Sequence, residues 1–269
     1  MYIRAHEGLG QEGRLSAPPA GKTYSPPFAK GGQPIEEDDR DKLLTILSGP
    51  SPYQDYILRV MKTHRAALPR TFFRIVTSLK QVPERLRHRF TRTRKSVVAG
   101  TVDRWTGTIY MLEARQVEGG RGPSFRARLE LALHEAVHLF GHPFIARVDE
   151  GTFQAAYGTG FGEGATQVIT EEIMAAQGIS PYAHERPYDE FTPPVRQLIS
   201  TFSMDTFARA YFWGEIRQLT EAMESRWGPA WRNVAHFTSS KNTRMALDEI
   251  KTLETSYRRR PVHLRWTFL

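Results

Sequence analysis

The chain has 269 residues, enough for one large domain or two small ones, and its 40% hydrophobic and 25% charged residues are typical of a globular protein. The absence of cysteine excludes disulfides and thiolate metal sites, so any metal must be bound by His, Asp or Glu. We find no apolar run long enough for a membrane-spanning helix and no apolar core of a cleaved secretory signal. We therefore expect a cytoplasmic protein in the producing cell, or one delivered or secreted without a cleaved signal peptide.

The net charge of +8 raises the question of an anionic partner. Basic residues concentrate in Arg85–Lys95 and again in Tyr257–Arg260. Such runs bind nucleic acid or lipid in some proteins and form a solvated face in others. No nucleic-acid-binding motif accompanies either run, so we favour the solvated face and do not expect nucleic acid as the partner.

The chain divides by composition into a leader, a folded domain and a tail. Glycine, proline and polar residues dominate the first 38 residues, which we predict to be flexible with little core of their own. We expect a sheet with helices in the first part of the folded domain and helices alone in the second. The predicted boundaries are a leader at 1–38, a domain at 39–260 with parts 39–145 and 146–260, and a tail at 261–269.

Helices and strands follow from the spacing of apolar residues. Before residue 100, it predicts two helices and then a strand: Asp41–Leu47, Tyr53–Ala67 and Phe72–Val76. Two further strand-like runs, Ser96–Val102 and Thr108–Leu112, are separated by Asp103–Gly107, which suits a hairpin connection. The sequence therefore predicts a small sheet before the longer helices begin.

The second half of the chain is predicted to be almost wholly helical. One helix should cover Phe125–Phe140 and end at Gly141. Four glycines at alternate positions, from Gly158 to Gly164, predict an irregular stretch, followed by a helix that stops at Gly178. Beyond Thr192 the helical pattern continues to about residue 257. The predicted fold class is α+β, predominantly helical.

The strongest chemical signal is an HExxH motif within the predicted helix Phe125–Phe140. His134 and His138 stand one helical turn apart, so both imidazoles can bind one metal ion. Glu135 lies off that line, within reach of a water molecule at the metal, and can act as its general base. Apolar residues flank the motif on both sides, and buried imidazoles are costly unless partnered. The pattern predicts a zinc-dependent (Zn²⁺) hydrolase, although two core histidines satisfied by hydrogen bonds would give the same spacing.

A catalytic zinc ion requires a third protein ligand and one open position. In the pattern HExxHxxGxxH the last ligand would fall on Phe144, and in a GTxD pattern it would fall on Phe161, so neither pattern applies. A glutamate on a second helix downstream is the remaining arrangement, and Glu163 meets it. Glu150, in a similar Glu-Gly segment, and His142, just beyond the helix, are rival ligands.

The segment Phe161–Glu172 resembles the NEGFTEYLT-like second helix of bacterial gluzincin-type peptidases, in which the Glu before Gly is the third zinc ligand. The similar order of elements extends over about residues 100–225, with Gly162 in place of a frequent Asn. The resemblance implies a zincin-like fold: a small mixed sheet over the HExxH helix, then a helical C-terminal subdomain. It implies a metalloprotease with Glu163 as the third ligand and a protein or peptide as the substrate.

The resemblance also bears on delivery and on the oxyanion that forms during peptide hydrolysis. Related peptidases without a signal peptide include delivered toxins and effectors, for which delivery machinery or an inhibitor protein would be further partners. Related enzymes stabilise the oxyanion with a Tyr, His or Arg after the Glu helix. We favour Tyr188, because it falls in a loop between predicted helices. The other candidates are Tyr157, His184 and Tyr211, of which Tyr211 has the pattern of a core residue.

Two other functions fit the sequence. The first is a zinc hydrolase of non-peptide amides or esters, because activation of water does not depend on what carries the carbonyl. The second is a basic nucleic-acid- or membrane-binding module with a structural or vestigial metal site. For a peptidase, we expect the substrate to lie as an extended strand along Thr108–Leu112, provided that this strand is an open edge of the sheet. An interior strand that serves only the core is the alternative.

Overall fold

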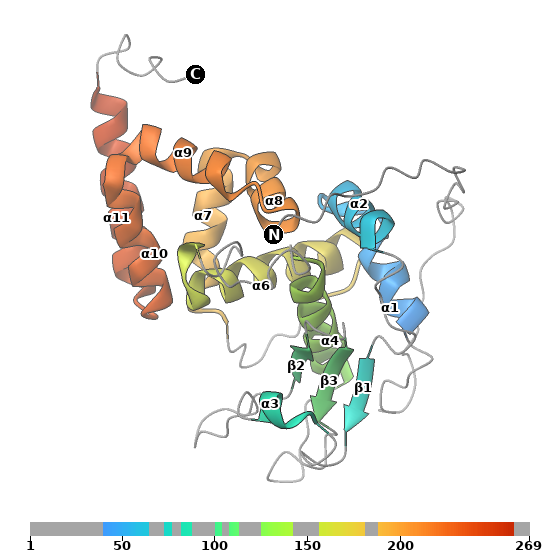
Figure 1. The fold of residues 1–269 in the computed structure, drawn as a ribbon. Coiled ribbons are helices and arrows are strands. Elements are labelled where there is room, and N and C mark those ends of the chain that lie inside the picture. Colours follow the sequence, from blue (N-terminus) through green and yellow to red (C-terminus); the bar gives the residue numbers. More distant parts are fainter. Residues whose placement is uncertain are drawn as a thin grey trace, which may run out of the picture.

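The structure is a computed structural model (Figure 1) and describes the following residues: 40–64, 73–76, 82–87, 100–103, 108–112, 125–141, 156–180 and 188–260. Within them the protein is predominantly helical with one small sheet, which confirms the predicted α+β class. The predicted leader and tail lie outside the described residues. No helix in the described part of the chain is long and apolar enough to cross a membrane.

The sheet is mixed and contains three strands in the order β1-β3-β2 (Figure 1), formed by Phe73–Val76 (β1), Gly100–Asp103 (β2) and Thr108–Leu112 (β3). β3 pairs in parallel with β1 and antiparallel with β2, and the register of the antiparallel pair places Asp103 opposite Thr108. The predicted hairpin strands therefore do pair. The prediction that Thr108–Leu112 is an open edge is wrong, because neighbours on both sides occupy its backbone hydrogen-bonding groups.

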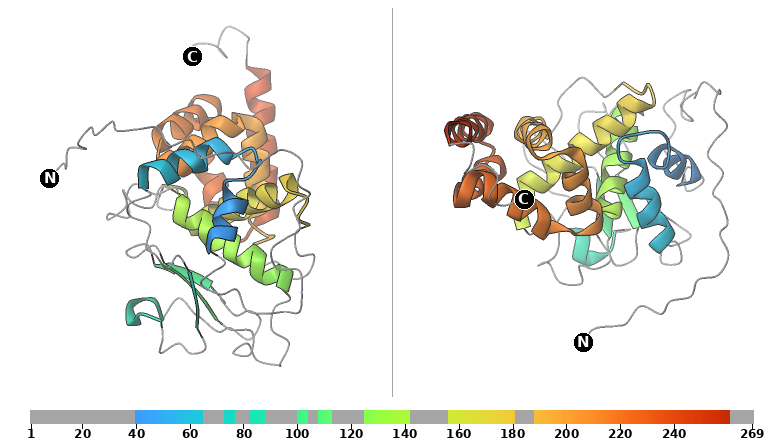
Figure 2. Two further views of the ribbon diagram at one scale, coloured as in Figure 1. Left: turned by 90° about the vertical axis from the view of Figure 1, so that its right-hand side faces the viewer. Right: turned by 90° about the horizontal axis from the view of Figure 1, so that it is seen from above.

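Helix α4 (Phe125–Phe140) covers the sheet, packs against β2 and β3, and has the predicted bounds. On its other side lie α1 (Arg40–Leu47), α2 (Gln54–His64) and α6 (Thr159–Ala176) (Figures 1 and 2). The short helix α3 (Glu84–Arg87) packs with Tyr110 of β3 in a separate small cluster. The HExxH motif thus lies on a helix enclosed by the sheet and by other helices.

The glycine-rich stretch that was predicted to be irregular is helical and begins α6. A Cβ atom on Gly160 would lie 2.8 Å from Cε1 of Phe191, and one on Gly164 would lie 2.7 Å from the carbonyl oxygen of Phe191. Glycine disfavours a helix in isolation, but here only glycine allows Phe191 to pack so closely. The contacts of the folded chain therefore override the local preference.

The remaining helices form a layer beyond α6 (Figure 2), with bounds α7 (Thr192–Phe202), α8 (Met204–Trp213), α9 (Ile216–Trp227), η6 (Gly228–Ala230), α10 (Trp231–Ser239) and α11 (Thr243–Arg259). This agrees with the helical pattern predicted beyond Thr192. One continuous hydrophobic core joins these helices to α1, α2, α4 and α6. α8 reaches from this layer towards the C-terminal end of α4, where Tyr211 packs beside Gly141.

Candidate metal centre

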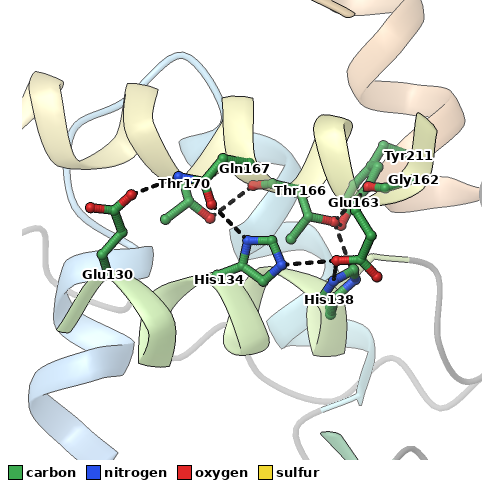
Figure 3. Close-up of polar contacts among 9 residues, drawn as sticks. All are labelled: Glu130, His134, His138, Gly162, Glu163, Thr166, Gln167, Thr170 and Tyr211. Carbon is green, nitrogen blue, oxygen red and sulfur yellow. Dashed lines mark hydrogen bonds and ion pairs between the residues drawn. The ribbon is translucent and has the colours of Figure 1, made fainter. Parts of the chain in front are cut away.

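Three potential metal ligands meet where α4 packs on α6 (Figure 3). Nε2 of His134 lies 3.1 Å from Oε2 of Glu163, and Nε2 of His138 lies 3.0 Å from the same oxygen. One atom from each of the three side chains falls within 4.8 Å of the others. The one-turn spacing on α4 aligns the imidazoles, and the first turns of α6 bring the carboxylate opposite them. The structure therefore brings together the three residues that were predicted as ligands.

The cluster lies in a largely buried environment. The side chain of His134 is 1% exposed, and those of His138 and Glu163 are 11% and 22% exposed. Burial alone would raise the pKa of the Glu163 carboxyl, but the charge of His138 and the hydrogen bonds with both imidazoles outweigh it. They hold this pKa well below its usual range. Glu163 is therefore a carboxylate at neutral pH, in the ionised form that binds a metal ion.

The ring nitrogen of His134 that points away from the cluster contacts a side chain of α6. Its Nδ1 lies 3.0 Å from Oε1 of Gln167. The amide nitrogen of Gln167 donates to Oε1 of Glu130 at 2.6 Å and to Oε1 of Glu171 at 3.0 Å. Glu171 in turn pairs with Arg196 of α7. A buried polar chain thus runs from the cluster of His134, His138 and Glu163 to the partly exposed guanidinium of Arg196.

The corresponding nitrogen of His138 contacts a hydroxyl group. Its Nδ1 lies 3.2 Å from Oγ1 of Thr166, which donates to the carbonyl oxygen of Gly162 at 2.9 Å and lies 2.6 Å from the hydroxyl of Tyr211. Because the Thr166 proton points to Gly162, its oxygen is an acceptor for His138. Tyr211 can lie here only because residue 141 is glycine: a Cβ atom at that position would lie 2.6 Å from the tyrosine ring.

The donor set fits a divalent metal ion. Two imidazole nitrogens and one carboxylate oxygen are a common zinc ligand set, and tetrahedral bonds of about 2.0–2.1 Å would separate neighbouring ligand atoms by about 3.3 Å. The Nε2–Oε2 separations of 3.1 and 3.0 Å are slightly shorter than this. A metal ion bound by Nε2 would take the place of the proton that joins each imidazole to the Glu163 carboxylate, and Nδ1 of each imidazole would keep its proton for the oxygen acceptor that it faces.

Tyr188 lies beside the cluster of three potential ligands, and Glu135 follows His134 on α4. Glu135 is buried against the sheet, and a Cβ atom on Gly100 of β2 would lie 3.1 Å from its Cγ and 3.2 Å from its Oε1. The ring of Tyr188 stacks on that of His134, with centroids 4.4 Å apart and planes inclined by 5°. Burial and the charges of Glu163 and Glu135 raise the pKa of the Tyr188 hydroxyl. This phenol therefore remains a proton donor at neutral pH.

The other candidates named from the sequence have different places. Tyr157 lies in the core, where its hydroxyl donates to the carbonyl oxygen of Ile216 and lies 2.9 Å from Oγ1 of Thr220, so it serves α9 rather than the cluster. Tyr211 is buried, as its pattern predicted, and it also contacts the cluster through Thr166. The remaining candidates lie outside the described residues: His142, Glu150 and His184.

Sequence reasoning missed Thr166 and Gln167, which contact the imidazoles from behind. A usable signal was present in the spacing, because Thr166 follows Glu163 by three residues and Gln167 follows it by four. A helix that directs Glu163 at the cluster therefore directs Thr166 and Gln167 to the same side. Comparisons of the chain with protein-family models, with curated proteins and with solved structures found no match. The functional argument therefore depends on the geometry of the site itself.

Proposed function

We propose that this protein is a zinc-dependent metallopeptidase with a zincin-like arrangement of sheet, HExxH helix and glutamate helix. The observation that supports the proposal most is the convergence of Nε2 of His134, Nε2 of His138 and Oε2 of Glu163. Glu135 follows His134 on α4 and adds a buried carboxyl group that packs against Gly100 of the sheet. Two imidazoles, a ligand carboxylate and a second carboxylate are the groups that zinc-assisted hydrolysis needs.

A bound zinc ion would supply the Lewis acidity that makes water acidic and polarises the substrate carbonyl. His134, His138 and Glu163 would hold it and leave one position open. Glu135 would accept the proton from the attacking water and pass it to the departing amine as a general acid. Tyr188 would donate a hydrogen bond to the oxyanion, since its raised pKa keeps it protonated.

The sheet suggests where a peptide substrate would lie. Since β3 is internal, β2 is the edge nearest to α4 among the described strands. Gly100 brings the backbone of β2 close to the Glu135 carboxyl group without a side chain between them. An extended peptide paired with β2 would therefore pass beside the proposed general base, and backbone hydrogen bonds would hold it.

Two measurements test the proposal. Purified protein should contain one zinc ion per chain, and its hydrolytic activity should disappear on chelation and return with zinc. New protein N-termini should appear in a proteome treated with the wild-type protein and be absent after treatment with Glu135→Gln. Metal-free protein after expression in zinc-supplemented medium, or new N-termini that are identical for both proteins, would contradict the proposed function.

A further inference from the structure

We propose that Gln167 is a positioning residue of the metal centre. It connects His134 to the buried carboxylates of Glu130 and Glu171, and it fixes the imidazole of His134 in the Nδ1–H tautomer. The proposal rests on the proposed metal-binding function and goes beyond its three ligands. It assigns a task to the buried amide of Gln167, which lies on the Nδ1 side of His134 and is not one of the three proposed ligands (Figure 3).

The orientation of the Gln167 amide follows from its neighbours. Its nitrogen donates to Glu130 at 2.6 Å and to Glu171 at 3.0 Å, so both amide protons have carboxylate acceptors. A half-turn of the amide would place its oxygen against two carboxylates and leave them without these donors. That arrangement is repulsive in a buried site. The amide oxygen therefore faces His134.

This orientation determines which ring nitrogen of a neutral His134 carries the proton. The amide oxygen carries no proton, so the contact of 3.0 Å with Nδ1 requires that Nδ1 be the donor. In the neutral imidazole, Nε2 then keeps its lone pair, and Nε2 is the atom that faces Glu163 and the proposed metal position. The carboxylates of Glu130 and Glu171 act on His134 indirectly, because they polarise the Gln167 amide and make its oxygen a stronger acceptor.

Because the residues of this network are buried, removing their polar and charged groups from water costs free energy of folding. Glu130, Gln167 and Glu171 are all at least nine-tenths buried, and Glu171 pairs with the half-exposed Arg196. Apolar side chains of the same volume would stabilise this part of the core at least as well. A network of this kind is expected where it orients a functional group, and the group at its end is the imidazole of His134.

The zinc dissociation constant, measured by competition with a chromogenic chelator, tests the role of Gln167. Gln167→Met keeps the volume but removes the acceptor, and zinc should bind about 10–100-fold more weakly. The triple variant Glu130→Gln, Gln167→Glu and Glu171→Gln exchanges donor and acceptor in both contacts of the amide and keeps an acceptor for Nδ1 of His134, so it should recover most of the affinity. Thr170→Val is the matched control, because Thr170 is buried one turn from Thr166 and its hydroxyl donates to the carbonyl oxygen of Thr166. The zinc affinity of Thr170→Val should equal that of the wild type.

A measurement on the wild-type protein covers the case in which Gln167→Met fails to fold. In ¹⁵N-histidine-labelled, zinc-loaded protein, Nδ1 of His134 should carry the proton and Nε2 should show the shift of a metal-bound nitrogen. The reverse pattern would overturn the proposal, as would unchanged zinc affinity in a folded Gln167→Met. A wild-type protein that binds no zinc would instead refute the proposed function, so the two failures are distinguishable.

Discussion

Helices α6 and α11 are of similar length but place their polar residues in opposite environments. α6 buries 13 of its 18 residues, among them Thr166, Gln167, Thr170 and Glu171. α11 buries two of its 17 residues, Ala246 and Ile250, and its charges lie on the surface or in partly exposed ion pairs. Polar groups on α11 can be hydrated at little cost, whereas each one on α6 needs a protein partner.

The difference separates polar residues that lie in contact with solvent from those that meet at the candidate site. On α11, Arg244 pairs with Asp248 at 3.9 Å, and both side chains are largely exposed, which is typical of a solvated helix face. On α6, Thr166 and Gln167 each contact an imidazole of the HExxH motif. Substitutions on the two helices should therefore change different properties: metal binding and catalysis on α6, and small increments of stability on α11.

The largest expected effect is the loss of a proposed metal ligand. Glu163→Gln replaces the anionic oxygen that faces both imidazoles with a neutral amide, so stoichiometric zinc should be lost together with activity. Zinc content after dialysis, measured by atomic emission, is the test. Glu172→Gln is the control on the same helix, because Glu172 pairs with Arg196 on the surface side. Loss of zinc from the control alone would reverse the assignment of the two glutamates.

The next effect concerns turnover without loss of metal. Glu135→Gln should keep the zinc ion and the fold, because Glu135 is not among the three converging ligands. Turnover should fall by about 10²–10⁴-fold, the usual contribution of a general base. Single-turnover kinetics with a peptide substrate, together with zinc analysis of the same sample, would measure both properties. Full activity in a zinc-loaded Glu135→Gln would end the proposed role of Glu135.

Much of this arrangement could be predicted from the sequence, because the signals were local. The periodicity of apolar residues predicted α4 with its bounds, and a one-turn spacing predicted the paired imidazoles. Pairing between strands is not local: the neighbour of β3 on its second side is β1, which lies more than 30 residues earlier in the chain, so the central position of β3 could not be seen in its own residues.

The glycines at the start of α6 show the same limit. Their helix-disfavouring preference is local, whereas the close approach of Phe191 that makes them necessary comes from a distant segment. Tyr211 was predicted to be a core residue and is buried, but its hydroxyl contact with Thr166 depends on how α8 packs on α4 and α6. Such partners become visible only when the helices are assembled.

An intermediate effect is expected where α8 meets α4. In Gly141→Ala the new methyl group would lie 2.6 Å from Cε1 of Tyr211, a buried ring with little room to move. The free energy of unfolding should fall by about 1–3 kcal/mol, as for other overpacked cores. Gly49→Ala is the matched control, because the atoms nearest to its methyl group belong to the far end of the Gln177 side chain, so it should cost less. Chemical denaturation of both variants gives the comparison, and equal losses would contradict it.

The smallest effect is expected on α11, at the ion pair that ties it to α9. Glu254 accepts hydrogen bonds from Arg226 at 2.6 and 2.7 Å and from the indole of Trp227 at 2.8 Å. Burial would raise the pKa of the Glu254 carboxyl, but the hydrogen bonds from Arg226 and Trp227 outweigh it and lower this pKa below its ordinary value of 4.5. A lowered pKa in the folded protein means that the ionised carboxyl stabilises the fold above pH 4.5, and that this contribution disappears as the pH falls through the lowered value.

Glu254→Gln should therefore lower the free energy of unfolding by no more than about 1 kcal/mol near neutral pH, because the pair is partly exposed and salt screens it. The difference from the wild type should shrink in acid, where the wild-type carboxyl becomes protonated, and it should also shrink in high salt. Zinc affinity should be unchanged, in contrast to the variants of α6. Urea denaturation at neutral and acidic pH measures the first property, and chelator competition measures the second. If Glu254→Gln weakened zinc binding as much as Gln167→Met, the separation between a site-building α6 and a solvated α11 would not hold.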